Sequence, residues 1–243
     1  MDSSSQTVLP ARNSDRVLVI MAKAPRPGAV KTRLNPSLPL QAVTAFYSCL
    51  LDDTLALTQS LAGVEVAIMC PDSDVNELAH LAGHRVRVAA QHGAGLAAGL
   101  TSVFAHFTEG HQRRIIAFNS DSPHLPRSIL EAAFEILAAY DLVVGPTYDG
   151  GYYLVGAKTS YPALFTGEGM GTASALERLL SCARALELSV GFTDPFYDID
   201  VADDLIRLAG ELEGAPARAP KTALWLKQWG DAVTLLRTGT GDL

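Results

Sequence analysis

The chain has 243 residues, of which 48% are hydrophobic and 19% charged, a composition too apolar and too weakly charged for an intrinsically disordered protein. Its 19 basic and 26 acidic side chains give a formal net charge of −7, which argues against a nucleic-acid-binding protein. The three cysteines are widely spaced and form no Cys-x-x-Cys pair. A disulfide scaffold and a cysteine zinc site are therefore disfavoured, and a reducing, cytoplasmic compartment is expected.

No apolar run approaches the ~18 residues that would span a bilayer, so we expect no membrane segment. Residues 1–14 are polar and lack the basic and apolar regions of a signal peptide, and they are interpreted as a flexible tail.

From residue 17 onward, short apolar runs alternate with longer segments of helical spacing. Strands are predicted at residues 17–21, 64–69, 86–89, 115–118, 142–145, 152–156 and 188–192. Helices are predicted at residues 40–59, 75–81, 96–107, 128–139, 172–186, 201–212 and 222–236. The alternation is typical of βαβ units, which predicts an α/β fold with a mostly parallel sheet and helices on both faces. Right-handed crossovers would place the carboxyl end of every strand on one edge, where ligands of such sheets bind.

The domain organisation follows from a change of composition near the C-terminus. Residues 15–212 are predicted to form one domain, followed by a Pro- and Ala-rich linker at 213–220. The last helix carries Trp225 and Trp229 four residues apart, hence on one face. This face is expected to dock on the domain or on a second subunit, which leaves a homodimer open.

A basic loop follows the first predicted strand. Residues 22–34 contain Lys23, Arg26, Lys31 and Arg33 and no acid, although the chain as a whole is acidic. Lysine point charges, arginine forks and free backbone N–H groups suit a polyphosphate; a solvated basic loop is the alternative. The loop is not a Walker A motif, because a valine and not a glycine precedes Lys31.

Acidic and glycine-rich segments follow other strands. Asp121 comes after the strand at 115–118 and could hold Mg²⁺, or it could start an Asx turn. His124 in the same loop is interpreted as a loop or capping residue and not as a ligand. A helix begins after the glycine-rich turn 92–96, and its N-terminus could attract an anion or a base edge, with an ordinary loop as the alternative.

Two further segments complete the candidates. Asp149-Gly150-Gly151 separates two apolar runs, which is typical of a hairpin turn, although glycines also permit close approach to a ligand. Asp198 and Asp200 alternate along an extended segment and could meet Asp121 across a metal ion. Alternatively, Asp200 is the N-cap of the next helix, or it serves in both roles.

Two motifs are missing from the sequence. It has no Gly-x-Ser-x-Gly nucleophile elbow, which disfavours an α/β-hydrolase. It also has no Gly-x-Gly-x-x-Gly after the first strand, which disfavours a dinucleotide oxidoreductase.

Taken together, residues 21–34, 120–126, 145–156 and 197–205 resemble the glycosyltransferase-like family known as domain of unknown function 2064, in the nucleotide-diphospho-sugar transferase superfamily. The sequence is more distantly similar to the guanylyltransferases that activate phospholactate or phosphoenolpyruvate. The resemblance covers about residues 16–210 and implies a GT-A (Rossmann-like) three-layer sandwich with a mostly parallel mixed sheet. The chain departs from relatives at 91–100, where it lacks their acidic residue, and at 166–172, where it lacks their tryptophan.

The resemblance implies a role for each matching residue. Lys31 and Asp121 would be catalytic, and Asp121, Asp198 and Asp200 would bind Mg²⁺ or Mn²⁺. The residues expected to bind the nucleotide are Ala22, Lys23, Lys31, Arg33, Gly93 and Ser120. Asp149, Gly150 and Gly151 would line the acceptor side.

The sequence therefore predicts a Mg²⁺-dependent transferase that takes a nucleotide or nucleotide sugar and a small-molecule acceptor. The first hypothesis is nucleotidyl transfer from an NTP to a phosphate or carboxylate, with release of pyrophosphate. The alternatives are glycosyl transfer from a nucleotide sugar and a nucleotide-binding module without catalysis.

Overall fold

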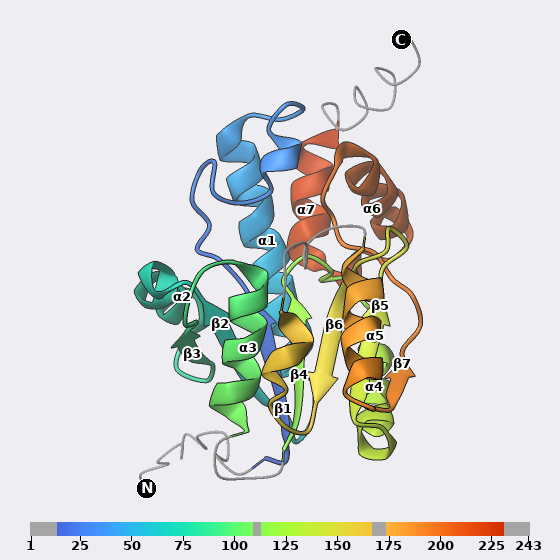
Figure 1. The fold of residues 1–243 in the computed structure, drawn as a ribbon. Helices are drawn as coiled ribbons and strands as arrows, with labels where there is room; N and C mark the ends of the chain where they lie inside the picture. The colour runs from blue at the N-terminus through green and yellow to red at the C-terminus, as the bar shows by residue number, and fades with distance from the viewer. Residues whose placement is uncertain (1–13, 109–112, 167–173, 231–243) are drawn as a thin grey trace, which may run out of the picture.

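The computed structural model describes residues 14–108, 113–166 and 174–230, and within them it has seven strands and seven α-helices (Figure 1). The strands are β1 (Arg16–Met21), β2 (Glu65–Cys70), β3 (Arg87–Ala90), β4 (Arg114–Asn119), β5 (Leu142–Pro146), β6 (Tyr152–Ala157) and β7 (Val190–Phe192). The helices are α1 (Leu40–Gln59), α2 (Val75–Ala82), α3 (Gly95–Phe107), α4 (Arg127–Ala139), α5 (Ala175–Ala185), α6 (Ala202–Gly214) and α7 (Pro220–Gln228). Every predicted element is present, with boundaries that shift by a few residues.

Parts of four predictions lie outside the described residues. They are almost all of the predicted tail at 1–14, the missing tryptophan at 166–172, the first two residues of the helix predicted at 172–186, and the end of the last predicted helix beyond residue 230.

The strands form one mixed sheet in the order β3-β2-β1-β4-β6-β5-β7. Strand β6 runs antiparallel to both β4 and β5, and the other neighbouring pairs are parallel. The expectation that all strands end on one edge is therefore wrong for β6. The turn between β5 and β6 is too short to carry the chain back across the sheet, so β6 forms a hairpin with β5.

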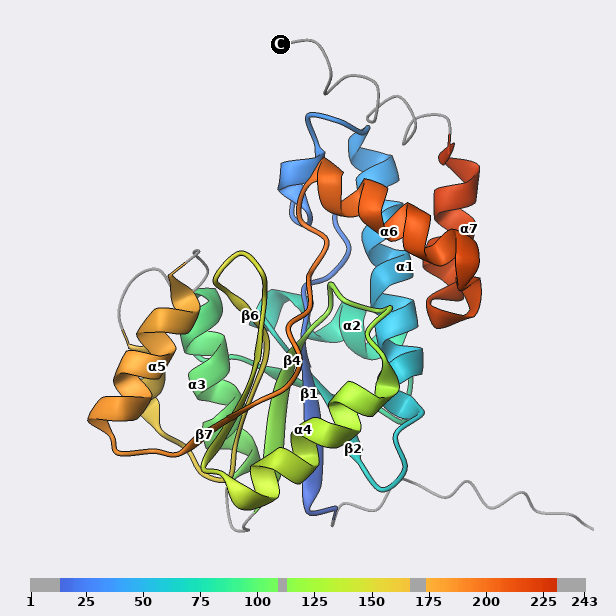
Figure 2. The ribbon, with the colours of Figure 1, turned by 90° about the vertical axis from the view of Figure 1, so that its right-hand side faces the viewer.

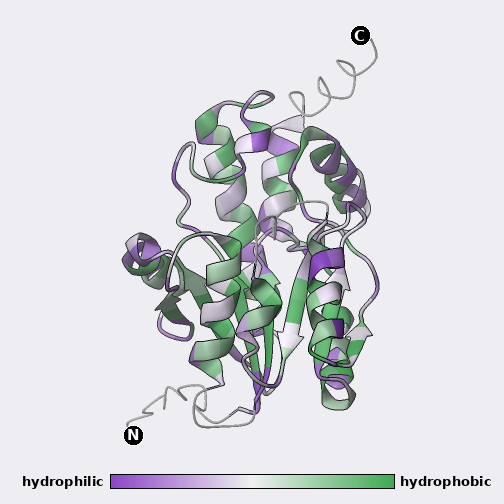
Figure 3. Cartoon of the chain, in the orientation of Figure 1, coloured by the Kyte–Doolittle hydropathy of each residue, from purple (hydrophilic) through white to green (hydrophobic). Residues whose placement is uncertain are grey.

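Helices cover both faces of the sheet, as Figures 1 and 2 show. Leu18 and Ile20 of β1 pack in a cluster with α1, α2 and α4, whereas Val17 and Val19 pack in another with α3 and α5. Successive side chains of a strand point to opposite faces, so a continuous apolar run is what a strand buried on both sides requires. Figure 3 shows the same pattern, with hydrophobic colour concentrated on the central strands. The predicted three-layer α/β sandwich is confirmed.

A third apolar cluster joins α1 to α6 and α7, above the sheet edge in Figure 2. The Trp225 ring lies 4.7 Å from that of Phe46 and 5.6 Å from that of Trp229. The N-terminus of α7 is also fixed, because the Asp53 carboxylate accepts hydrogen bonds from the backbone N–H groups of Lys221 and Thr222. Of the two docking alternatives for the tryptophan face, contact with the domain is therefore present.

No helix among the described residues is long and apolar enough to cross a membrane.

The order of the strands creates a switch point beside β1. The chain runs from β1 through β2 to β3 in one direction, then returns to place β4 on the other side of β1. At such a point the two outgoing loops diverge and leave a crevice beyond the carboxyl ends of the strands. In this protein the loops concerned are the basic loop after β1 and the loop that begins at Ser120.

Candidate active site

A cavity of about 790 Å³ occupies the crevice at the switch point. Its walls are the basic loop after β1, the segment after β2, the glycine-rich turn before α3, and Ser120 with Asp121 after β4. Tyr47 of α1 and Asp200 complete it. The cavity lies beyond the carboxyl ends of the parallel strands, the place where ligands of such sheets bind (the strand-end rule).

The cavity brings together every residue predicted to bind a nucleotide. These residues are Ala22, Lys23, Lys31, Arg33, Gly93 and Ser120. Asp121 and Asp200 also line the cavity, whereas Asp198 and the predicted acceptor residues do not. The roles assigned to these residues remain predictions, but their placement around one cavity makes them compatible with a single ligand.

Lys31 is the most constrained of the cations. Its Nζ lies 2.9 Å from Oδ2 of Asp121 and 2.9 Å from Oδ1 of Asp200, and its side chain is only 4% exposed. Burial by itself would lower the pKa of Lys31, but the charges of Asp121 and Asp200 outweigh it and raise the pKa above its ordinary value. The ammonium is therefore charged throughout the physiological pH range.

The backbone at Lys31 is also unusual. Its φ of 47° and ψ of 41° lie in the left-handed region, which L-residues with a side chain rarely adopt. Three residues earlier, Gly28 turns the loop with a φ of 74°. Together these two positions direct the Lys31 side chain inward from a largely exposed loop.

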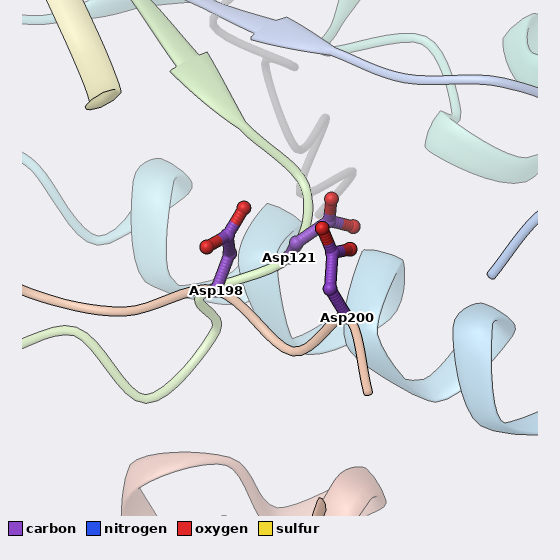
Figure 4. Close-up of side chains that lie close together, drawn as sticks. All are labelled: Asp121, Asp198 and Asp200. Atoms are coloured by element: carbon purple, nitrogen blue, oxygen red, sulfur yellow. The ribbon is translucent and has the colours of Figure 1, made fainter. Parts of the chain in front are cut away.

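Three carboxylates, drawn in Figure 4, lie close together, and two of them contact this ammonium. Asp121 follows β4, and Asp198 and Asp200 lie on the segment before α6; one oxygen from each lies within 4.8 Å of the others. Burial and the negative charges of Asp200 and Asp121 raise the pKa of Asp198 to about 6. Burial tends to raise the pKa of Asp200 as well, but Lys31 and Arg33 outweigh it and lower that pKa. Because hard divalent cations prefer carboxylate oxygens, this donor set fits Mg²⁺ or Mn²⁺.

The expectation that Asp200 caps α6 is wrong, and the structure shows why its side chain is free for the cavity. The carboxylate of Asp204 accepts hydrogen bonds from the backbone N–H groups of Asp200 and Val201, 3.0 and 2.9 Å away. The capping position itself is Val201. With the backbone donors satisfied by Asp204, the Asp200 carboxylate contacts Lys31 and, at 3.3 Å, Arg33.

The two acidic segments are tied to each other by backbone and side-chain contacts. The N–H of Ile199 donates to the carbonyl of Asp121, and Oγ of Ser122 donates to the carbonyl of Tyr197. His124 is fully buried against the rings of Phe196 and Tyr197. Burial, followed by the charges of Arg218 and Arg207, lowers the pKa of His124 to about 3, so it is a neutral packing residue. These contacts fix the spacing between Asp121 and the other two carboxylates.

Arg26 does not belong to the cavity, although the sequence groups it with the other bases. Its guanidinium pairs with Asp74 at 2.7 Å and with Glu77 at 2.9 Å. Asp74 also accepts a hydrogen bond from the backbone N–H of Ala24. Arg26 therefore attaches the basic loop to the start of α2.

Sequence reasoning missed Tyr47, which links both sides of the cavity. Its hydroxyl forms a hydrogen bond with Oγ of Ser120 and accepts one from the backbone N–H of Lys23, each at 3.1 Å. Burial and the charge of Asp121 raise the pKa of this phenol to about 12. Tyr47 lies within an apolar helical pattern, so its spacing gives no sign that its hydroxyl reaches a loop 73 residues away.

One end of the cavity is mainly apolar and was also missed. Met21, Met69 and Leu96 line it together with Gln91, whose side-chain amide donates to the carbonyl of Gly93 at 2.8 Å. A Cβ on Gly99 would lie 2.7 Å from Cε of Met21 and 2.8 Å from Oε1 of Gln91, so a larger residue there would shift the ends of these two flexible side chains. Residues 69–71 and 91 stand at the carboxyl ends of β2 and β3, so the strand-end rule could have found them.

The predicted acceptor residues form a tight turn, whose Gly150 carbonyl also accepts a hydrogen bond from the N–H of Leu176 in α5. The carboxylate of Asp149 accepts hydrogen bonds from the hydroxyl of Thr147 and the backbone N–H of Gly151, and Gly150 has a φ of 90°. The hairpin interpretation is thus confirmed, and the acceptor role of Asp149, Gly150 and Gly151 stays a prediction.

The fold, together with a family match over part of the chain, agrees with the resemblance found in the sequence. The chain has the α/β fold of nucleotide-diphospho-sugar transferases: it matches a crystal structure from Desulfovibrio desulfuricans G20, described as a "putative nucleotide-diphospho-sugar transferase", with a TM-score of 0.84 and 26% identity over 92% of this chain and 99% of that one. Residues 54–172 match the family described as "Uncharacterized protein conserved in bacteria (DUF2064)". That range includes Asp121 and Asp149 but not the basic loop or Asp200.

More distant structures share the fold alone. One is 4-diphosphocytidyl-2C-methyl-D-erythritol synthase from Anaerococcus prevotii, with a TM-score of 0.54 and 10% identity over 82% of this chain and 97% of that one. Another is CMP:2-keto-3-deoxy-manno-octonic acid synthetase in complex with CTP, with a TM-score of 0.53 and 13% identity over 82% and 99%. A search of curated proteins gave no significant match.

Proposed function

We propose that this protein is a metal-dependent nucleotidyltransferase, which transfers a nucleotidyl group from an NTP to a phosphate or carboxylate of a small molecule. The observation that carries the proposal is the single cavity in which three cations of the β1 loop face Asp121 and Asp200. The names of its structural relatives support a transferase, and two of these relatives are synthases or synthetases of cytidylyl products.

The phosphates would lie at the ionic end of the cavity. Lys23 and Arg33 border it with exposed side chains, and Lys31 borders it with a buried one. An ammonium in a buried setting interacts more strongly with phosphate oxygens than one in water. Lys31 is thus suited to stabilise charge on the leaving pyrophosphate, while the two exposed cations orient the chain of phosphates.

A divalent cation would be held by Asp121 and Asp200, with Asp198 as a third ligand. Their oxygens are close enough to share one ion, and two backbone-linked segments keep them so. When bound, Mg²⁺ or Mn²⁺ would supply positive charge against the phosphate oxygens and help to align them.

The base and the acceptor would take the remaining space. The apolar wall of Met21, Met69 and Leu96 suits the faces of a nucleobase, and Gln91 offers polar atoms beside it. The acceptor would approach from the side of Asp149, Gly150 and Gly151. An acceptor oxygen attacks the α-phosphorus in line, the bond to the bridging oxygen breaks, and pyrophosphate leaves with its electron pair.

Glycosyl transfer from a nucleotide sugar is the second candidate. The name of the relative with 26% identity over 92% of the chain favours it. The same cations and carboxylates would then hold the diphosphate of the donor. The product separates the two reactions, because nucleotidyl transfer releases pyrophosphate and glycosyl transfer releases a nucleoside diphosphate.

The test is a binding screen followed by product analysis. Nucleoside triphosphates and nucleotide sugars are titrated with and without Mg²⁺ by calorimetry, and binders are incubated with phosphorylated and carboxylated acceptors. We expect pyrophosphate release that Asp121→Ala abolishes and that Asp203→Ala, at an exposed acid in the first turn of α6, leaves intact. Nucleotide binding without any product from these acceptors would overturn the proposal and favour a binding module.

A further inference from the structure

The Lys31 ammonium lies among the same carboxylates that would hold the metal ion. It contacts one oxygen of Asp121 and one of Asp200, both at 2.9 Å, and these two residues are members of the three-carboxylate group. An ammonium donates hydrogen bonds to the lone pairs that a metal ion would otherwise use. A cation of the protein itself therefore already balances part of the negative charge of this site.

We propose that Lys31 is a resident counter-ion that a divalent cation must displace, so that metal ion and polyphosphate bind in mutual dependence. The metal ion takes the carboxylates of Asp121 and Asp200, and the ammonium moves to the phosphate oxygens of the substrate. The inference deepens the proposed function, on which it rests for the identity of the polyphosphate.

The charges in the cluster explain why each ligand favours the binding of the other. Asp121, Asp198 and Asp200 carry three negative charges at most, and Lys31 and Arg33 contribute two positive ones. A divalent cation added beside an unmoved Lys31 would place two cationic centres at the same oxygens, which repel each other. A polyphosphate supplies new anionic partners for Lys31 and relieves that repulsion.

Lys31 is held by its ion pairs and not by a favourable backbone conformation, so replacing those ion pairs would let its side chain move. Its left-handed backbone is unfavourable for a lysine and is accompanied by two good ion pairs. Gly28 and Ala29 are exposed and Ala29 borders the cavity, whereas Val30, directly before Lys31, is buried in the apolar cluster of α1, so the side chain of Lys31 and not its backbone would move. Arg33 differs, because its side chain is 65% exposed and contacts only Asp200 of the three acids. Arg33 can follow a phosphate without leaving a buried position.

Binding of Mn²⁺ alone, measured by calorimetry without nucleotide, tests the exchange directly. Lys31→Met removes the ammonium and keeps much of the side-chain volume; we expect it to bind Mn²⁺ at least about tenfold more tightly than the wild type. Lys23→Met is the matched control, because it removes one charge from the same cavity where the structure shows no ion pair with these acids; it should stay within about threefold.

A second measurement uses the wild-type protein and so avoids any effect of a substitution on folding. Lysines are acetylated with a water-soluble reagent, and the rate at each site is followed by mass spectrometry. Lys31 should react slowly because it is buried and paired, and saturating Mn²⁺ should increase its rate several-fold. Lys23 is exposed and should react at the same rate with and without Mn²⁺.

The outcomes separate this inference from the proposed function. Equal Mn²⁺ affinity in the wild type and Lys31→Met, or Mn²⁺ that leaves Lys31 acetylation unchanged, overturns the exchange even if pyrophosphate is released. Absence of Mn²⁺ binding in every variant also overturns it. Tighter binding by Lys31→Met supports the exchange, and it does so even where no acceptor yields pyrophosphate.

Discussion

Two cations of the same loop, Arg26 and Lys31, each lie between two carboxylates, yet their surroundings differ. Arg26 is 43% exposed and pairs with Asp74 and Glu77, whereas Lys31 is 4% exposed and pairs with Asp121 and Asp200. Only Lys31 lines the cavity. Both are bases in one Pro- and Gly-rich loop, so composition alone treats them alike.

The difference comes from where the acids lie along the chain. The partners of Arg26 follow β2, the strand beside β1 on the side where the chain goes first. The partners of Lys31 follow β4 and precede α6, on the other side of the switch point. Arg26 thus attaches the loop to one half of the sheet, and Lys31 connects the two halves across the crevice.

The largest expected effect is on catalytic activity, where substitutions of Lys31 and Arg26 should differ most. Lys31→Ala should lower kcat/KM for pyrophosphate release by about 10²–10³, because a positioned charge that stabilises the leaving group is lost. Arg26→Ala removes an equal charge from the same loop but outside the cavity, and it should cost less than about tenfold. The measurement is steady-state kinetics on folded variants. Equal losses would mean that the distinction between the two cations is wrong.

The second prediction concerns stability. Asp74→Ala should lower the free energy of unfolding by about 2–3 kcal/mol, because it leaves the N–H of Ala24 without its acceptor and removes one of the two carboxylates that pair with Arg26. Asp72→Ala, at an exposed acid in the same turn, should change it by less than about 0.5 kcal/mol. Urea denaturation measures both. A loss of the same size in the two variants would contradict an anchoring function for Arg26 and Asp74.

The comparison also shows what the sequence could and could not predict. The pattern of an apolar strand followed by a polar loop predicted that Lys31 and Asp121 lie at one edge of the sheet. This follows because the carboxyl ends of parallel strands lie on the same edge, whatever side chains the strands carry. The sequence could not separate Arg26 from Lys31, since Asp74 lies 48 residues from Arg26 and Asp200 lies 169 residues from Lys31. Such pairings depend on the order of strands in the sheet, which the alternation of elements leaves open.

The other site residues could not be assigned because the sequence around each of them allows several roles. Asp198, Asp200, Asp203 and Asp204 all stand where a helix could be capped, and spacing does not decide which carboxylate turns back to the backbone. In the structure Asp204 does so, and Asp200 is left for Lys31. Tyr47 was missed for a similar reason, because a phenol on an apolar helix face packs as a core residue and its hydroxyl partner cannot be inferred.

A third prediction uses the pKa of Asp198 to sharpen the description of the Lys31 cluster. In the unfolded chain this carboxyl ionises near 3.8, and in the folded protein its pKa is raised to about 6. Between pH 3.8 and about 6, the Asp198 carboxyl is still protonated in the folded protein and does not offer a charged oxygen to a metal ion. The affinity for the metal ion should therefore rise with pH as Asp198 loses its proton. From pH 5 to pH 7 the ionised fraction goes from about a tenth to about nine-tenths, which predicts up to about tenfold tighter Mn²⁺ binding.

Calorimetry at several pH values measures this dependence. The raised pKa of Lys31 and the lowered pKa of Asp200 keep both charged across the window, so neither should contribute to the slope. Asp198→Asn should bind Mn²⁺ more weakly and with a flat profile. A slope that persists in Asp198→Asn would assign the titration to another group.

The smallest effect concerns Gly28, which lies between Arg26 and Lys31. It turns the loop so that Lys31 points into the cavity and Arg26 toward α2. Its φ is 74°, and an added Cβ would meet no atom within 4 Å, so Gly28→Ala carries only the backbone penalty, about 1 kcal/mol of stability. Gly210 in α6 also has open space but an ordinary helical backbone, so Gly210→Ala should raise stability by about 0.5–1 kcal/mol. Thermal unfolding distinguishes the signs. A neutral Gly28→Ala would mean that the turn between Arg26 and Lys31 can relax, and that the ion pairs alone hold the two cations apart.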